Sequence, residues 1–244
     1  MENINQIRLI SIWIFIITFA SLNLCLFISV NYHLLEGTIF TVDPIGRSGF
    51  TIPYIDGSLS ISRTARTFPA YLIFKPGMLI TAILVIQYWR ANNKLIQTIN
   101  NDFSKKKYFL FFGVGSAVCL VIHSLLLGIH FEVDLYKFFR RFVLLAFIIF
   151  ELVAQALLIN SIIKIKNKIS EMINKKILIL KIFVVSLLLV IGILSLPILA
   201  STGHVHFKHA LEWNYFIGVI IFYLFTFLFW KKRDKTPVHT PRGV

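Results

Sequence analysis

Long runs of apolar residues, separated by short polar segments, make up most of this chain. A helix needs about 20 residues to cross the hydrocarbon core of a bilayer, and six of the runs are that long. They cover residues 8–30, 70–89, 108–130, 138–163, 177–200 and 211–230. Because the apolar residues come in blocks and do not alternate with polar ones, the pattern favours helices over strands. It predicts an all-α integral membrane protein, a single domain over residues 1–244 folded as a six-transmembrane-helix bundle.

The segment between the first two runs, residues 31–70, is the one long loop that is rich in Gly, Pro, Ser, Thr and charge. Turn signals recur along it, at Asp43-Pro44, Ser48-Gly49 and Asp56-Gly57. Between the turns, residues 50–55 are predicted to form a short extended piece. We expect this first outer loop to be a small compact cap on the bundle and not a domain of its own.

Composition supports a membrane protein and excludes two other classes. Hydrophobic residues make up 57% of the chain and charged residues 15%, whereas a soluble domain carries about 25% charge. The formal net charge of +14 would suit a nucleic-acid-binding protein. The basic residues, however, stand in short clusters beside the apolar runs, where they commonly flank membrane spans. We therefore predict membrane lipids as partners and no nucleic acid, and the sequence leaves protein partners open.

The distribution of Lys and Arg between the loops predicts the orientation of the bundle. With the N-terminus inside, the inner segments hold about twice as many of these residues as the outer ones, as the positive-inside rule requires. Both termini are therefore predicted to be cytoplasmic. The membrane would be the plasma membrane of a prokaryote, or an endomembrane or the plasma membrane of a eukaryote. Lys181, near the inner end of the fifth run, is expected to extend its amine to the interface.

Glu151 is the most informative single residue, because it falls near the midpoint of the fourth run, where an ionised carboxylate is costly. Gln155 lies one turn further on the same face. His123, in the outer half of the third run, would reach Glu151 if the two spans pack as neighbours. Glu151 and His123 are thus the candidates for chemistry inside the membrane, as a proton relay or a substrate contact. The alternative is a protonated or hydrogen-bonded Glu151 that ties helices together.

Histidine and acidic residues accumulate on the predicted outer side. They are His33, Glu36, Asp43, Asp56, His130, Glu132, Asp134, His204, His206, His209 and Glu212. His204 and His206 would share one side of an extended segment, and His209 and Glu212 one face of a helix. These four are ligand types that zinc accepts, although no HExxH motif accompanies them. We predict no cofactor, and keep a zinc site at these residues as the alternative to a solvated polar loop.

Four arginines stand at membrane level on the predicted outer side, which the positive-inside bias makes unexpected. They are Arg63, Arg66, Arg140 and Arg141. A guanidinium group can hold a phosphate through two hydrogen bonds. We therefore expect some of these arginines to engage phosphate head groups of the outer leaflet, the alternative being ordinary interfacial anchoring.

Two short motifs resemble one known family. Thr51-Ile-Pro-Tyr-Ile-Asp-Gly57, followed by Phe68-Pro69 and a second span, is similar to the Pro-aromatic-Ile-Ser-Asp loop of the DRAM-like membrane proteins, although Ile55-Asp56 stands where Ile-Ser-Asp is usual. The start of the sixth run, with Glu212 and Trp213, is similar to the Glu-Trp start of that family's last helix. The family groups damage-regulated autophagy modulators with FRAG-type GPI-anchor remodelling proteins and yeast SFK-type proteins.

The resemblance implies six spans, cytoplasmic ends and a role in lipid remodelling, lipid distribution or endomembrane regulation. It supplies motif positions and no catalytic residues. These positions are Pro53, Tyr54, Asp56, Gly57, Glu212 and Trp213.

The sequence therefore favours a multi-pass membrane protein that handles or organises lipids without catalysis. One alternative is a metal-assisted lipid hydrolase or remodelling enzyme that uses the outer His and acidic residues, with a zinc-activated water as nucleophile. A second alternative is a proton-coupled transporter that uses Glu151 and His123. The identity of the ligand and the oligomeric state stay open.

Overall fold

The computed structural model of the chain describes residues 2–99, 108–129, 134–201 and 203–231. Within these ranges the regular structure is helical and contains no strand. Six of the helices are long and apolar enough to cross a membrane. They are α1 (Glu2–Val30), α4 (Tyr71–Ile99), α5 (Tyr108–Leu126), α6 (Asp134–Ile165), α7 (Lys175–Ala200) and α8 (Val205–Phe229). The predicted all-α, six-span architecture is therefore confirmed.

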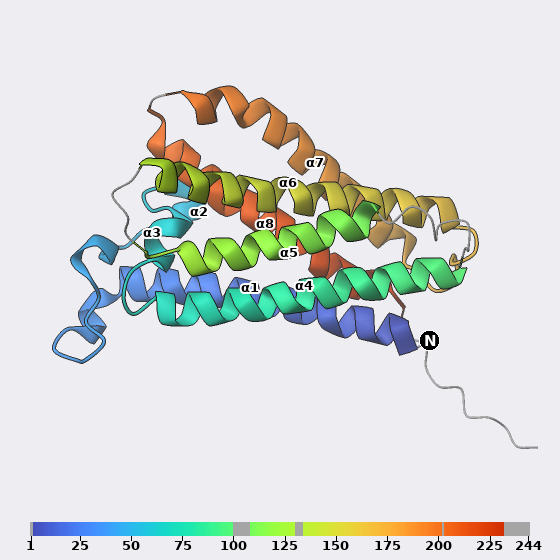
Figure 1. Cartoon of the computed structure of the whole chain (residues 1–244), viewed down its shortest axis with the longest axis horizontal. Helices are drawn as coiled ribbons and strands as arrows, with labels where there is room; N and C mark the ends of the chain where they lie inside the picture. The colour runs from blue at the N-terminus through green and yellow to red at the C-terminus, as the bar shows by residue number, and fades with distance from the viewer. Residues whose placement is uncertain (1, 100–107, 130–133, 202, 232–244) are drawn as a thin grey trace, which may run out of the picture.

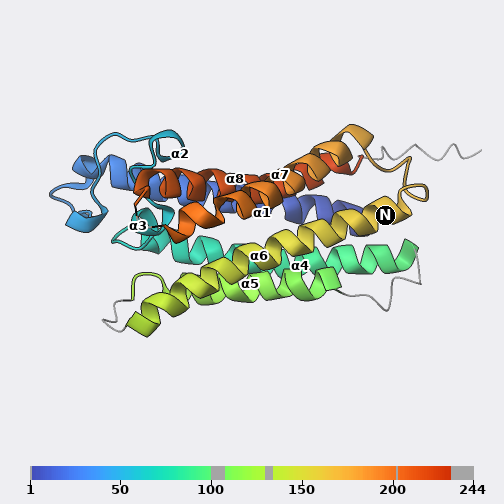
Figure 2. The ribbon, with the colours of Figure 1, turned by 90° about the horizontal axis from the view of Figure 1, so that it is seen from above.

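The six long helices pack in sequence order and close on themselves as a ring. Each packs against the next along the chain, and α8 returns to pack against α1. Successive helices run in opposite directions, so the described chain begins and ends at the same end of the bundle (Figures 1 and 2). We call this the terminal end, and the opposite end, which carries residues 31–70, the loop end. At the loop end α7 lies apart from α6 in both views.

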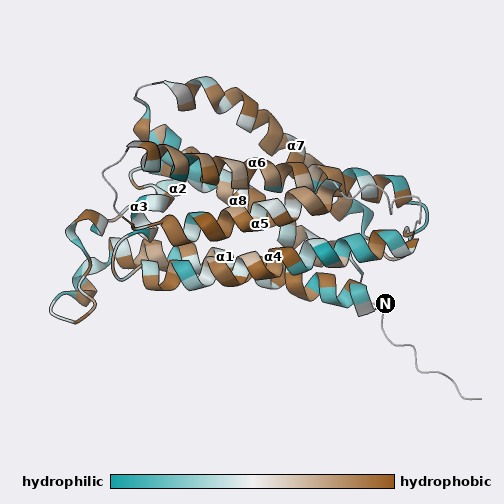
Figure 3. Ribbon diagram, viewed as in Figure 1, coloured by the Kyte–Doolittle hydropathy of each residue, from teal (hydrophilic) through white to brown (hydrophobic). Residues whose placement is uncertain are grey.

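Three helices extend at least six residues beyond the apolar runs that predicted them, and the first of these is α1, which begins at Glu2 where the run begins at residue 8. The run over residues 70–89 lies inside α4 except for its first residue, and α4 continues to Ile99 because Leu95 and Ile96 are still buried against the bundle. The run over residues 211–230 lies inside α8 except for its last residue, and α8 already begins at Val205. Figure 3 shows the polar residues of α4 gathered at the terminal end, beyond the apolar middle of the bundle. Hydropathy alone therefore located the helices but underestimated the length of three of them.

Close contacts between helices depend on small residues. Gly113 of α5 lies under the Trp89 ring of α4, so that a Cβ at this position would overlap the indole. Gly77 of α4 approaches Ser21 of α1 in the same way. Membrane helices pack by direct contact and not by excluding water, so small residues let their backbones come together.

The loop over residues 31–70 contains four short helical pieces. They are η1 (Tyr32–Leu35), η2 (Pro44–Gly46), α2 (Pro53–Asp56) and α3 (Ile61–Ala65). The prediction of an extended piece at residues 50–55 is wrong, because a helical turn begins at Pro53 and ends at Gly57, which has the left-handed conformation. Proline at the first position and glycine just past the end are the usual bounds of a helix.

Gly57 also allows the loop to dock on α8. Its φ is +59°, and a Cβ there would overlap the backbone carbonyl of His206. Gly37, in the same loop, has a similar φ of +78° but no atom within 4 Å of its Cβ position. The two glycines therefore share a backbone conformation and differ in what surrounds them.

This difference predicts unequal effects of alanine at the two positions. Gly37→Ala should destabilise by about 1–2 kcal/mol, the cost of a side chain in the left-handed region. Gly57→Ala should destabilise by about 3–5 kcal/mol, because overpacking against α8 is added to the same strain. Thermal unfolding of both variants in mild detergent measures the difference. Equal destabilisation would contradict the close docking of the loop on α8.

Candidate functional site

The carboxylate of Glu151 lies in the middle of the helix ring and is 1% exposed. Three side chains donate hydrogen bonds to it. Ser116 Oγ of α5 lies 2.6 Å from Oε2, Gln155 Nε2 lies 3.1 Å from Oε1, and the Tyr223 hydroxyl of α8 donates to Oε1. We call Ser116, Glu151, Gln155 and Tyr223 the central polar cluster. It joins three helices through one side chain, as a buried polar group in hydrocarbon requires.

A second group of buried polar residues adjoins this cluster towards the terminal end. Lys181 Nζ donates to Thr226 Oγ1 at 2.7 Å, and the Tyr88 hydroxyl lies 3.1 Å from the same oxygen. The ammonium also lies 3.9 Å from the centroid of the Phe222 ring, a cation–π contact. We call Tyr88, Lys181 and Thr226 the lysine group. It joins α4, α7 and α8.

The lysine group corrects one prediction. Lys181 was expected to extend to the interface, but its side chain is 0% exposed. The reason is that Lys181 faces the ring interior, where Thr226 supplies an acceptor and aromatic rings supply a surface for the charge. The snorkelling rule applies to lysines on the lipid-facing side of a helix. The apolar sequence around Lys181 did not reveal which side it occupies.

His123 does not contact Glu151. The two helices do pack as neighbours, but Ser116 takes the position against the carboxylate, two turns of α5 away from His123. The His123 ring faces the backbone carbonyl of Arg140 instead, and its buried Nδ1 has no hydrogen-bond partner among the described residues. Trp89 Nε1 and Gln155 Oε1 are likewise buried without a partner there. Nothing in the sequence distinguished Ser116 from the other small residues of the third run as the partner of Glu151.

The two motifs that carry the family resemblance touch each other at the loop end. Tyr54 and Trp213 stack edge to face with centroids 4.9 Å apart. Trp213 Nε1 donates to the carbonyl of Leu59 at 2.8 Å, and His209 Nδ1 lies 3.0 Å from the carbonyl of Gly57. Pro53 is buried at the start of α2. These motif positions thus hold the loop on the first turns of α8.

Asp56 acts within the loop. Its carboxylate accepts hydrogen bonds from the hydroxyl of Thr51 and from the backbone N–H groups of Ile52 and Ser58, at 2.8–2.9 Å. The Ser58 hydroxyl donates as well, at 2.8 Å. These donors, the Ser58 N–H foremost, lower the pKa of Asp56 from 3.8 to about 2, against the opposing effect of burial. Asp56 therefore closes a turn of the loop.

Three of the four predicted arginines gather at the loop end. Arg66, at the end of α3, feels the positive charges of both Arg63 and Arg140, and burial together with these charges lowers its pKa. Arg63 also donates from Nε to the carbonyl of Ile45 at 3.0 Å. We call Arg63, Arg66 and Arg140 the arginine cluster. Arg141 follows on α6 and is exposed.

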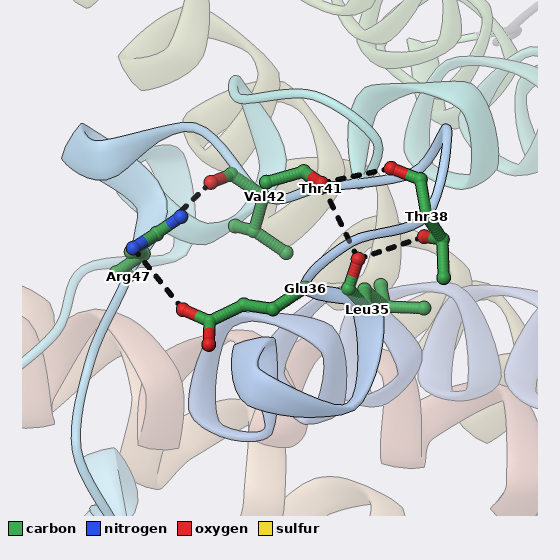
Figure 4. A network of polar contacts seen from close by, with 6 residues as sticks. All are labelled: Leu35, Glu36, Thr38, Thr41, Val42 and Arg47. Carbon is green, nitrogen blue, oxygen red and sulfur yellow. Dashed lines mark hydrogen bonds and ion pairs between the residues drawn. The ribbon is translucent and has the colours of Figure 1, made fainter.

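The acidic residues of the loop do not neutralise this cluster. The Asp56 carboxylate accepts hydrogen bonds within its own turn, and the Asp43 carboxylate accepts one from the backbone N–H of Phe68 at 3.0 Å. Glu36 pairs with Arg47 at 3.3 Å, and Figure 4 shows the same guanidinium donating to the carbonyl of Val42. This is the one ion pair in the described part of the chain. The arginine cluster therefore has no carboxylate partner within that part.

The four zinc candidates do not converge. His209 is bonded to the loop, Glu212 faces the backbone N–H groups of Ile61 and Ser62, and His204 and His206 are exposed. Over residues 2–99, 108–129, 134–201 and 203–231, no three His, Cys, Asp or Glu side chains are placed to share a metal. His130 and Glu132 lie outside the described residues, as does the side chain of Asp134.

A shallow groove of about 460 Å³ lies on the outside of the bundle between α5 and α6. Its lining is apolar and consists of Leu110, Phe111, Val114, Gly115, Val118, Cys119 and Phe150. These residues of α5 are nearer to the terminal end, whereas the arginine cluster is at the loop end. The groove and the cluster therefore occupy different halves of the bundle.

No family model, curated protein or solved structure matches the chain. The resemblance to the DRAM-like proteins therefore stays a prediction.

The lysine group predicts opposite effects for two substitutions of similar shape. Thr226→Val should destabilise by about 1–3 kcal/mol, because Lys181 and Tyr88 then lose their shared partner. Lys181→Met should be neutral or stabilising, because it removes a buried charge and keeps an unbranched apolar chain. The free energy of unfolding of both variants, measured in bicelles and compared with that of wild type, gives the sign of each effect. If Lys181→Met destabilises the protein as much as Thr226→Val does, this would contradict the placement of the Lys181 ammonium in the bundle interior without an ion-pair partner.

Asp56 predicts a pH dependence of the loop. Since its pKa is lower in the folded protein than its ordinary value of 3.8, ionisation stabilises the turn above about pH 4. That contribution should be lost as the pH falls through about 2. Hydrogen exchange of residues 51–58, compared between wild type and Asp56→Asn at each pH, measures it. The variant should show no such transition, and a transition of equal size in both proteins would assign it to another group.

Proposed function

We propose that the protein binds and organises anionic membrane lipids at its loop end, without catalysing a reaction. The observation that carries the proposal is the arginine cluster, in which the charges of Arg63 and Arg140 act on Arg66 and no carboxylate among the described residues pairs with any of the three. Like charges so placed repel one another, and an anion between them relieves the repulsion. Guanidinium groups bind phosphate in a two-pronged geometry, which makes a lipid phosphate the natural anion in a membrane.

The surface of α6 supports a lipid as the source of this phosphate. An exposed apolar stripe begins beside the cluster and continues toward the middle of the helix. It consists of Phe138, Phe142, Leu145 and Ile149, which are 48–67% exposed. Arg141 lies on the same helical face, at the loop end of the stripe. A lipid whose head group meets the arginines can therefore lay its acyl chain along α6. With the predicted orientation, this lipid belongs to the outer leaflet.

The resemblance to the DRAM-like proteins supports the same proposal, since it implies roles in lipid remodelling or distribution. The contact between the two motifs suits this, because Tyr54 and Trp213 hold α3, and with it Arg63 and Arg66, at a fixed place on the bundle. The motif positions are then supports of the lipid site and do not touch the lipid themselves.

Replacing the arginines tests the proposal. Each contact of an arginine with an anionic lipid is worth about 1 kcal/mol, so each Arg→Gln change should weaken binding about fivefold. The protein is placed in nanodiscs containing phosphatidylglycerol and phosphatidylcholine, extracted, washed in detergent and analysed for retained lipid by mass spectrometry. The triple variant of Arg63, Arg66 and Arg140 should lose most of the retained phosphatidylglycerol.

Arg47→Gln is the matched control. It removes the same charge from the same loop, but Arg47 is already neutralised by Glu36. Its retention of phosphatidylglycerol should therefore equal that of wild type. If the triple variant retains as much phosphatidylglycerol as Arg47→Gln, the arginine cluster is not a lipid site and the proposal fails.

A further inference from the structure

Buried polar residues follow one another through the ring interior as a column. His123 stands nearest the loop end, the central polar cluster follows, and the lysine group lies nearest the terminal end. His123 and Ser116 are about 10 Å apart along α5, and Tyr223 and Thr226 about 4.5 Å apart along α8, from the rise of a helix. The column therefore covers about half of the ~30 Å hydrocarbon core. Bundle stability alone does not require so many polar groups in line.

Two members of the column are ionisable groups of opposite kind with no ion-pair partner among the described residues. Glu151 and Lys181 are 1% and 0% exposed. Each of them is bonded to a hydroxyl group. Tyr223 donates to Glu151, and Thr226 links Lys181 to Tyr88. Ionisable residues inside a membrane characteristically mark ion or proton pathways.

We propose that this column transfers protons, with Glu151 and Lys181 as the two sites that take up and release them. The transfer is balanced. The Lys181 ammonium loses one proton and becomes an amine, and the Glu151 carboxylate gains one and becomes a carboxylic acid. Neither bonds between heavy atoms nor net charge change. The pair is neutral overall in both states, so the ring interior holds no unbalanced charge before or after the step.

Hydroxyl groups are suited to relay the proton because each accepts one hydrogen while donating another. Thr226 Oγ1 contacts Lys181, Tyr88 and the carbonyl of Phe222, at 2.7–3.1 Å. Thr226 can therefore accept a proton from Lys181 and donate its own hydrogen to the Tyr88 hydroxyl. Tyr88 and Tyr223 meet edge to face with ring centroids 4.9 Å apart. The proposed path crosses from Tyr88 to Tyr223 at this ring contact, where no direct hydrogen bond joins the two hydroxyl groups.

The groups around each site are those that such a path requires. Glu151 faces the titratable Tyr223 of α8 and the non-titratable Ser116 of α5 and Gln155 of α6, with Tyr88 of α4 nearby. Lys181 faces Thr226 and the rings of Phe222 and Phe229 of α8. Trp89 of α4 also faces Glu151 and Tyr223.

Proton flux into liposomes tests the proposal. Full-length protein is reconstituted with the dye pyranine inside, and a potassium gradient with valinomycin sets the membrane potential. Wild type should acidify or alkalinise the vesicles at least tenfold faster than protein-free vesicles. Glu151→Gln and Lys181→Met should return the rate to that of protein-free vesicles, and Tyr223→Phe should slow it at least tenfold.

Matched variants separate loss of the path from loss of the fold. Lys168→Gln and Glu36→Gln remove the same residue types from exposed places and should conduct like wild type. Lys181→Met is expected to fold at least as stably as wild type, and size-exclusion profiles and melting curves check this for every variant. Wild-type flux equal to that of protein-free vesicles would overturn the proposal. So would wild-type rates in folded Glu151→Gln or Lys181→Met.

Discussion

A carboxylate buried in the middle of a membrane bundle must be satisfied by the protein itself, and the ring of helices is built around that requirement. Glu151 is 1% exposed, and donors from α5, α6 and α8 meet at its two oxygens. Each donor fixes the rotation of its helix about its own axis. The lysine group does the same for α4, α7 and α8. Together the two groups connect five of the six long helices.

The loop end obeys a different constraint. Here the acidic residues of the loop are used to close turns or to pair with Arg47, and the described part of the chain offers no carboxylate to the arginine cluster. Positive charge is thus concentrated where the bundle meets the head-group region. The interior is polar but balanced, whereas this end is charged and unbalanced. On that contrast rest the two proposals, proton transfer in the interior and binding of an anionic lipid at the loop end.

The sequence predicted the architecture because hydropathy runs report helices in a membrane directly. It also singled out Glu151, since depth in the membrane can be estimated from position along a run. It did not predict the partners of Glu151. Ser116 and His123 lie on the same helix, and the choice between them depends on how far α5 is shifted along α6, which no local pattern encodes.

Local sequence patterns also could not predict the surroundings of Lys181 and of the arginines, for the same reason. Whether a lysine faces lipid or the ring interior depends on helix rotation, and the uniformly apolar α7 gives no preferred face. The arginines were recognised as unexpected on the outer side, but the sequence did not show that the charges of Arg63 and Arg140 act on Arg66, because that depends on where the loop places α3. That placement depends on the docking of the loop on α8 through Gly57 and Trp213, which are far apart in the sequence.

A double-mutant cycle most directly tests the claim that Glu151 ties the helices together. Tyr223→Phe is made in wild type and in Glu151→Met, and the free energy of unfolding is measured in bicelles. Hydrogen bonds of this kind in membrane proteins couple by about 0.6–1.7 kcal/mol, so Tyr223→Phe should destabilise wild type and leave the Glu151→Met protein unaffected. Effects that add within about 0.3 kcal/mol would show that the two side chains act independently. The carboxylate would then not be the connection on which the ring depends.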